Sequence, residues 1–209
     1  MKKFFKSLML ISVCLGLSAT VNAKTFRYAT TGDILGLDPH ANNEGPTNTM
    51  KGNIYGRMLH RKADLSLEPD LATKWEKLDA NTWRFSLRRG VKFHNGNDFN
   101  ADDVLFSYKR QTQEASDMSF ALATIKQINK VDDYTVDLIT KGPDPILLLN
   151  MPMFYIVDKE WIEANNAFEV VRASGSTNFA NVNTNGTGPF KVVEWIQDTR
   201  IVLEPFEGY

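Results

Sequence analysis

The chain has 209 residues, of which 43% are hydrophobic, 23% charged and 11% aromatic, a composition that excludes a disordered protein and fits one large domain or two small ones. Lys and Arg number 24 against 25 Asp and Glu, which argues against nucleic acid as a partner, because such a partner needs a basic face. The single cysteine, Cys14, excludes an internal disulfide and a cysteine-based metal site.

The first 23 residues have the order of a cleavable secretory signal. Three lysines precede an apolar run over residues 8–17, and small residues follow up to Ala23. We therefore expect cleavage after Ala23 and export to the periplasm, as in Gram-negative bacteria. The apolar run is about half of the roughly 20 residues that a membrane-spanning helix needs, which disfavours a membrane anchor.

Removal of this signal changes the charge and the thiol content of the chain. Val13 precedes Cys14 where a lipoprotein signal has a small residue, so we expect no lipid anchor. Cleavage removes three lysines and the cysteine, and 21 basic residues then face 25 acidic ones, a net charge of −4. The exported chain has no disulfide, so its stability depends on a packed core.

Strand patterns dominate the first half of the exported chain. Residues 25–30 alternate and are rich in β-formers, which predicts a strand, and the polar residues 41–47 predict a loop. Apolar residues near helical spacing predict a helix over residues 49–60, although Gly52 and Gly56 weaken it. Strand patterns at residues 71–78 and 82–87 predict a hairpin.

Helices and hairpins alternate in the second half. Asn100 can cap a helix over residues 101–111. Pro145 can start a helix at residues 146–149, and Asp158 can cap a helix that holds Trp161. Residues 174–185 predict a polar loop. The remaining patterns predict a short helix at residues 120–125 and hairpins at 128–131 with 134–140 and at 190–195 with 200–203. The mixture is α plus β with several antiparallel hairpins.

The sequence contains no catalytic or phosphate-binding motif. It has no Gly-x-Ser-x-Gly nucleophile turn and no glycine-rich phosphate loop. The histidines lack a partner at ligand spacing, so we expect turn or surface residues rather than metal ligands at His40, His60 and His94. Neighbouring carboxylates point apart on a helix or strand, so we expect no acid/base pair at Asp102–Asp103 or Asp132–Asp133. These patterns favour binding over catalysis, with no cofactor and no metal.

Five segments resemble, in order, one family of proteins. They are Leu37–His40, Leu67–Ala72, Trp83–Gly96, Phe99–Val104 and Gly186–Phe190. These motifs are similar to those of the extracytoplasmic solute-binding proteins of peptide- and nickel-type ABC importers, the dipeptide and oligopeptide receptors. The resemblance covers essentially the whole exported chain.

The resemblance implies a mixed α/β fold in which two lobes close over a ligand, with an extra subdomain. On this pattern residues 24–50 belong to the first lobe, residues 51–179 to the extra subdomain, and residues 180–209 return to the first lobe. Members of the family are more than twice as long, so we expect the second lobe beyond Tyr209. The chain would then be the amino-terminal part of a receptor, from a truncated or frameshifted gene or a partial sequence.

The resemblance also implies ligand contacts. In related peptide receptors the loop after the Leu-Asp-Pro turn touches the ligand backbone, and this loop corresponds here to Asn43, Glu44 and Gly45. A solvent-exposed loop without contacts is the alternative. Phe120 stands where some oligopeptide receptors place an aromatic contact. The family's anchors for the peptide termini would lie in the second lobe.

The function implied is that of a monomeric periplasmic receptor that delivers di- or oligopeptides to an inner-membrane ABC permease complex, without catalysis. The alternatives are a non-functional remnant and an exported enzyme whose catalytic part lies beyond residue 209. The sequence leaves the ligand open among a dipeptide, an oligopeptide, a metal complex, haem and an opine.

Overall fold

A computed structural model describes residues 25–172 and 177–209. The chain divides into two compact units, residues 1–30 and residues 31–209. The predicted signal lies outside the described residues. Within the described ranges, none of the helices combines the length and the apolar character needed to cross a bilayer.

Residues 25–30, the described part of the first unit, form no strand, so the strand prediction for them is wrong. The alternation that suggested a strand places Phe26 and Tyr28 on one side, and their rings stack on each other with centroids 5.8 Å apart. All six residues are exposed. An alternating sequence indicates only a preference for extended backbone. A strand forms when that backbone also pairs with a neighbouring strand through hydrogen bonds.

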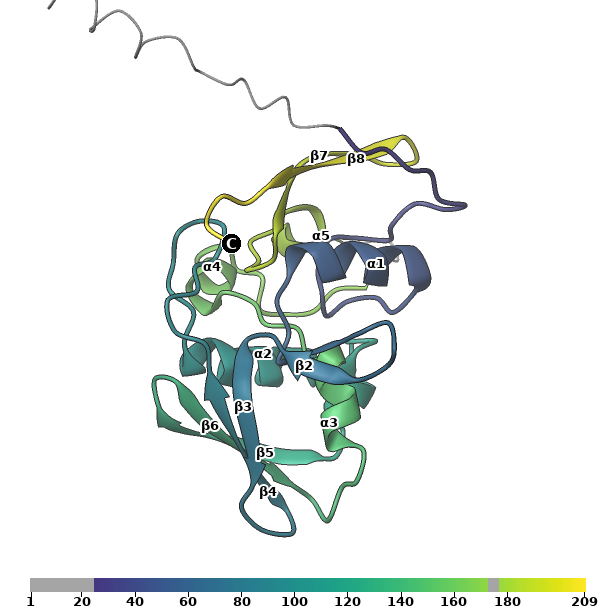
Figure 1. Ribbon diagram of the computed structural model, residues 1–209. Coiled ribbons are helices and arrows are strands. Elements are labelled where there is room, and N and C mark those ends of the chain that lie inside the picture. Colours follow the sequence, from purple (N-terminus) through teal and green to yellow (C-terminus); the bar gives the residue numbers. More distant parts are fainter. Residues whose placement is uncertain (1–24, 173–176) are drawn as a thin grey trace, which may run out of the picture. The chain divides into compact units, whose positions relative to one another are not determined.

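A four-stranded antiparallel sheet forms one end of the second unit (Figure 1). Its order is β3–β4–β6–β5. The predicted hairpins are confirmed as β3 (Ala72–Lys77) with β4 (Thr82–Leu87), and as β5 (Ile125–Asp132) with β6 (Thr135–Thr140). Phe85 pairs with Trp75 on one side and Val136 on the other, so that register buries one face of the sheet.

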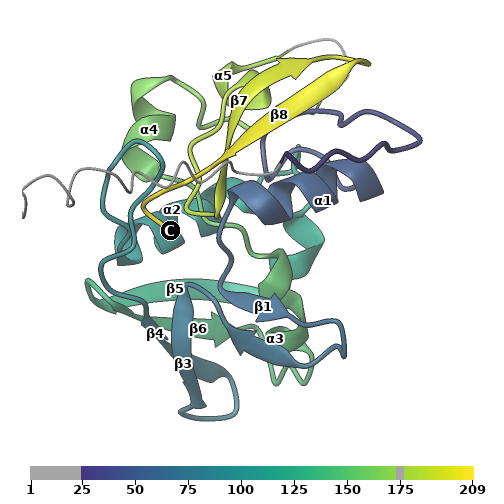
Figure 2. The same ribbon diagram turned by 45° about the horizontal axis from the view of Figure 1, so that its top comes forward.

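Helix α2 (Ala101–Gln111) lies between this sheet and α4 (Lys159–Ala164) (Figure 2). The predicted cap is confirmed, because Asn100 accepts from the Asp102 amide and Asp103 accepts from the Asn100 amide. Two stripes with the spacing i, i+3, i+4, i+7 follow the helix. The apolar stripe packs toward the sheet and contains Ala101, Val104, Leu105 and Tyr108. The mixed stripe is buried on the other side and contains Asp103, Phe106, Ser107 and Arg110.

Helix α1 (Gly45–Ile54) begins and ends earlier than predicted. Residues 45–47 are helical rather than part of the predicted loop, because the Glu44 side chain caps the helix at the Thr47 amide and Pro46 suits the first turn. The chain leaves the helix at Tyr55 in an extended conformation. The C-terminal end of the predicted helix instead becomes β1 (Leu59–Arg61), which pairs with β2 (Leu67–Pro69).

The short elements follow the predictions in most places. Asp158 caps α4 at the Trp161 amide, as predicted. The helix expected after Pro145 is α3 (Leu147–Asn150), followed by the 3-10 turn η2 (Met151–Met153), and the helix expected at residues 120–125 is the 3-10 turn η1 (Ser119–Leu122). The final hairpin is confirmed as β7 (Phe190–Ile196) and β8 (Arg200–Pro205). Within the predicted loop at 174–185, α5 (Phe179–Val182) forms because Asn178 and Asn181 cap each other; residues 174–176 lie outside the described residues.

Two hydrophobic cores fill this unit. One lies between the four-stranded sheet and α2 and includes Phe85, Phe93 and Leu138. The other is built around α1, α4 and the second face of α2, and includes Ile54 and Phe106. Helix α2 therefore contributes to both cores, and its polar groups must be satisfied where the second core meets it.

A buried ion pair provides hydrogen-bond acceptors for the guanidinium of Arg110, the charged group on the buried mixed stripe of α2 that has the most N–H donors. Arg110 and Asp38 are both fully inaccessible to water, with Nη1 to Oδ1 at 2.8 Å and Nη2 to Oδ2 at 2.5 Å. Arg110 also donates from Nε and Nη2 to the Ala167 carbonyl and from Nη1 to His40 Nδ1. All five guanidinium N–H groups are thereby used. The pair binds the segment before α1 to α2 and to the residues after α4.

His40 completes this network as a neutral imidazole. It lies in a turn, one of the two positions expected from the sequence, and it is fully buried rather than on the surface. Its Nε2 must carry the proton, because it faces the Tyr155 carbonyl at 3.0 Å, while Nδ1 accepts from Arg110. Burial and the adjacent guanidinium lower the pKa of His40 to about 3. Burial alone would raise the pKa of Asp38, but Arg110 holds it below its usual value.

The segment Gly186–Gly188 passes directly against the end of α1. The Gly188 amide donates to the Ile54 carbonyl at 2.8 Å. A β-carbon at Gly188 would stand 2.6 Å from the Ile54 carbonyl carbon and 2.7 Å from the Asn53 carbonyl oxygen. The absence of a side chain at these glycines allows this close backbone contact.

We predict that Gly188→Ala destabilises the protein by about 1–3 kcal/mol, because the added methyl group meets backbone that cannot move aside without breaking α1. Gly142→Ala is the matched control, since a β-carbon at Gly142 meets nothing within 4 Å, and it should change the free energy of unfolding by less than about 0.5 kcal/mol. Urea denaturation of both variants measures this. Equal stability of the two variants would contradict the close approach.

We predict that acid destabilises the protein through His40. Its pKa is 6.5 in the unfolded chain and about 3 in the fold, so the unfolded chain binds more protons and the free energy of unfolding falls as the pH falls through this range. Between about pH 6.5 and about pH 4 the loss amounts to roughly 3 kcal/mol.

His40→Gln should show a shallower fall over the same range, since glutamine keeps an N–H for the Tyr155 carbonyl and cannot gain a proton. His60→Gln, at a partly exposed histidine on β1, should keep the wild-type slope. Urea denaturation at several pH values compares the three proteins. Parallel curves for wild type and His40→Gln would show that His40 is not held neutral.

Candidate functional site

The predicted ligand loop lies immediately before α1, and hydrogen bonds connect it to the helix. Asn43 is exposed, Glu44 is partly exposed, and Gly45 is the first residue of the helix. The Asn43 side chain accepts from Asn48 Nδ2 at 2.7 Å. Oε1 of Glu44 accepts from the Thr47 amide at 2.9 Å; among the described residues, Oε2 accepts no hydrogen bond. The loop therefore presents one carboxylate oxygen and one glycine backbone to its surroundings.

The inner side of the loop rests on polar groups from α2 and the turn that follows it. Ser116 donates to the His40 carbonyl at 2.7 Å, and the Asp117 amide donates to the Ala41 carbonyl at 3.2 Å. This turn leads directly into η1, which carries Phe120 with 49% of its surface exposed. The turn that precedes Phe120 thus contacts residues 40 and 41, which come just before the predicted contact residues 43–45. It shows no hydrogen bond or ring contact between Phe120 and the described loop residues.

Lys51 lies beneath the loop and was not singled out by the sequence. It is 1% exposed, and its Nζ donates to the Asn42 carbonyl and to Asn48 Oδ1. Burial lowers the pKa of Lys51 to about 8, and the nearby carboxylates of Asp38 and Glu44 limit the fall. At neutral pH the ammonium is therefore charged, and its hydrogen bonds fix the backbone of the loop.

A groove in the described residues lies elsewhere. It has a volume of about 740 Å³ and a mixed apolar and polar lining around α4, α5 and β7, which includes Trp161, Phe179, Asn181 and Trp195. None of the predicted contact residues lines it. A groove of this size is a common place for a ligand. Of its lining residues, Asn181 is a buried polar group, whereas Arg110, Ser116 and Lys51 are all buried and hydrogen-bond to residues 38–42, just before the predicted loop.

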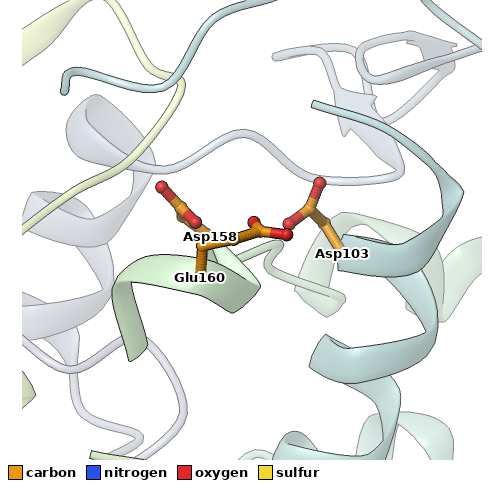
Figure 3. A group of neighbouring side chains, drawn as sticks. All are labelled: Asp103, Asp158 and Glu160. Carbon is orange, nitrogen blue, oxygen red and sulfur yellow. The ribbon is translucent and has the colours of Figure 1, made fainter. Parts of the chain in front are cut away.

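A second polar cluster lies where α2 and α4 begin (Figure 3). The carboxylates of Asp103, Asp158 and Glu160 have oxygen atoms within 4.8 Å of one another. Burial, and the neighbouring carboxylates after it, raise the pKa of Asp103 to about 7, although its oxygens accept from the Lys159 and Asn100 amides. By spacing alone the three groups could hold a cation.

The hydrogen bonds of Asp158 indicate a structural junction instead. Its Oδ1 accepts from the Trp161 amide. Its Oδ2 accepts at 2.7–2.9 Å from three side-chain amides, those of Asn95, Asn97 and Asn185. Four donors occupy this carboxylate, so it joins the turn at residues 94–97 and the segment before Gly186 to α4. The sequence argued against an acid pair between Asp102 and Asp103, which are adjacent in the chain. The acidic neighbours of Asp103 are instead Asp158 and Glu160, which are distant in the sequence.

The comparisons with known proteins agree with this fold. A family model described as bacterial extracellular solute-binding proteins, family 5, middle part, matches residues 66–209. The chain is 31% identical to the dipeptide-binding protein of Escherichia coli K12 over 94% of its own length and 40% of that protein. It is 31% identical to heme-binding protein A of Haemophilus influenzae over 88% of its length and 37% of that protein.

A solved structure gives the same picture. The periplasmic binding protein DppA of Helicobacter pylori, in complex with the peptide STSA, superposes with a TM-score of 0.72 at 29% identity, over 85% of this chain and 38% of that one. The chain thus spans about 40% of the length of its curated relatives. The mixed α/β fold is that of part of a periplasmic binding protein. The chain belongs to family 5 of the bacterial extracellular solute-binding proteins.

Proposed function

We propose that the chain is part of a periplasmic receptor that binds di- or oligopeptides and delivers them to an inner-membrane ABC permease complex, without catalysis and as a monomer. The observation that carries the proposal is the fixed loop before α1, on a fold whose relatives are named for peptides and, in one case, solved with one. Another relative is named for heme, so the peptide is the part of the proposal that most needs a test.

The proposed contacts are Asn43, Glu44, Gly45 and the nearby Phe120. The unoccupied Oε2 of Glu44 suits the ammonium group of a peptide. A β-carbon at Gly45 would meet no atom within 4 Å beyond its neighbours and its own helix, so the glycine leaves open space for a ligand backbone. The exposed ring of Phe120 suits an apolar side chain of the ligand.

The proposed domain boundaries are supported by the sheet core alone. Residues 24–50 and 180–209 contribute Ile34, Met50 and Ala180 to the second core, but most of its buried residues, Ile54 and Phe106 among them, come from residues 51–179. The sheet core draws all its buried residues from positions 58–156, inside the proposed extra subdomain, residues 51–179. Export of the protein would rest on residues 1–23 as a cleavable signal.

We predict that a peptide shifts the backbone amide resonances of residues 42–48 and 117–121 when the isotope-labelled chain is titrated with dialanine or tetra-alanine. Gly45→Ala should weaken this binding about tenfold, since a methyl group would stand where the ligand backbone approaches. Its thermal unfolding should match that of wild type, because the methyl group meets no other part of the protein.

Gly142→Ala serves as the matched control and should bind as wild type does. Shifts centred on the groove between α5 and β7 would move the site away from the loop. Saturable binding of ferric heme, with no response to either peptide, would refute the peptide as ligand.

A further inference from the structure

The place of Lys51 in α1 directs its side chain toward the predicted site. Side chains on a helix point back toward the N-terminus, and Lys51 is the seventh residue of α1. Its ammonium group therefore reaches back under the residues that precede the helix, and it contacts Asn42, nine positions earlier. An apolar side chain would be the ordinary occupant of a position that is 99% buried.

The hydrogen bonds of Lys51 go to the loop rather than to an acid. Nζ donates to the Asn42 carbonyl and, at 3.2 Å, to Asn48 Oδ1. Asn48 in turn donates from Nδ2 to Asn43 Oδ1 at 2.7 Å. One ammonium group thus supports the backbone at Asn42 directly and the side chain at Asn43 through Asn48.

The charges around Lys51 do not require it as a counter-ion. Asp38 already has Arg110 as a bidentate partner, and Asp117 pairs with Arg172 at 2.8 Å. Glu44 uses one oxygen to cap α1, and His40 is neutral. The centroid of the Tyr155 ring lies 5.8 Å from Nζ and 5.8 Å from the guanidinium carbon of Arg57. Burial of the ammonium costs free energy, and its hydrogen bonds to the described residues go to the Asn42 carbonyl and to Asn48.

We propose that Lys51 is a positioning residue of the peptide site, whose ammonium group holds the Asn42–Gly45 backbone in the conformation that receives the ligand. This inference rests on the proposed function and names a residue behind the contact surface. Lys51 does not touch the ligand. It acts through the Asn42 carbonyl and through Asn48.

The test compares Lys51→Met with wild type and with Lys109→Met, which removes an exposed lysine from α2. Dialanine affinity is measured by isothermal titration calorimetry at about pH 7 and about pH 9.5, and thermal unfolding is followed in parallel. We expect Lys51→Met to bind about tenfold more weakly or worse at pH 7, as loss of a charged hydrogen bond implies. Its amide resonances should change at residues 42–48 before any ligand is added, and Lys109→Met should bind as wild type does.

The pH series distinguishes an effect of the Lys51 charge on the loop from an effect of Lys51 on packing alone. The affinity gap between wild type and Lys51→Met should narrow as the pH rises past about 8, where Lys51 loses its proton, while the ligand's amino group titrates equally for both proteins. Asp38, His40, Glu44, Asp117 and Tyr155 are the titratable groups facing Lys51, and they are unchanged between the two proteins.

Wild-type affinity in Lys51→Met, with any loss confined to its melting temperature, would overturn the role of Lys51. If wild type itself binds no peptide, the proposed function falls and the role of Lys51 falls with it, so the two failures are distinguishable. Should Lys51→Met fail to fold, Lys51→Gln keeps one donor without the charge, and the same affinity criterion applies to it.

Discussion

The carboxylate of Asp38 and the guanidinium of Arg110 meet inside the protein with no access to water. Burying two charges costs free energy unless each makes its full set of hydrogen bonds, and here Arg110 donates five. The acceptors belong to the segment before α1 and to the residues after α4. These bonds therefore connect three stretches of chain, and the proposed ligand loop, Asn43–Gly45, begins three residues beyond His40.

Other hydrogen bonds also join segments that are distant in the sequence. Asp158 collects three asparagine amides and joins the turn before Phe99 to α4. Gly188 lets a distant strand approach the end of α1 closely enough for a backbone hydrogen bond. Helix α2 lies between the two cores, with one apolar stripe and one mixed stripe. The proposed site thus stands on a frame whose polar groups are mostly occupied, while Oε2 of Glu44 and the space over Gly45 stay open.

Local patterns predicted the elements that depend on local chemistry. The cap at Asn100, the cap at Asp158 and the paired strands of the hairpins follow from neighbouring residues, and the structure confirms them. Features that depend on distant partners were missed. Nothing near His40 in the sequence indicates that it is buried, because its partners Arg110 and Tyr155 lie far along the chain. Lys51 bonds to the nearby Asn42 and Asn48, and the sequence around it likewise does not indicate burial. The family resemblance supplied the loop at residues 43–45, and only the fold shows what supports it.

We infer that the Asp38–Arg110 pair holds the loop before α1 in place. Amide hydrogen exchange in Asp38→Asn, compared with wild type, tests this inference, because the substitution keeps the shape of the side chain and removes its charge. We expect faster exchange at residues 40–48 and at residues 165–170, with the four-stranded sheet as protected as before. Unchanged exchange at residues 40–48, or a uniform increase across both cores, would contradict it.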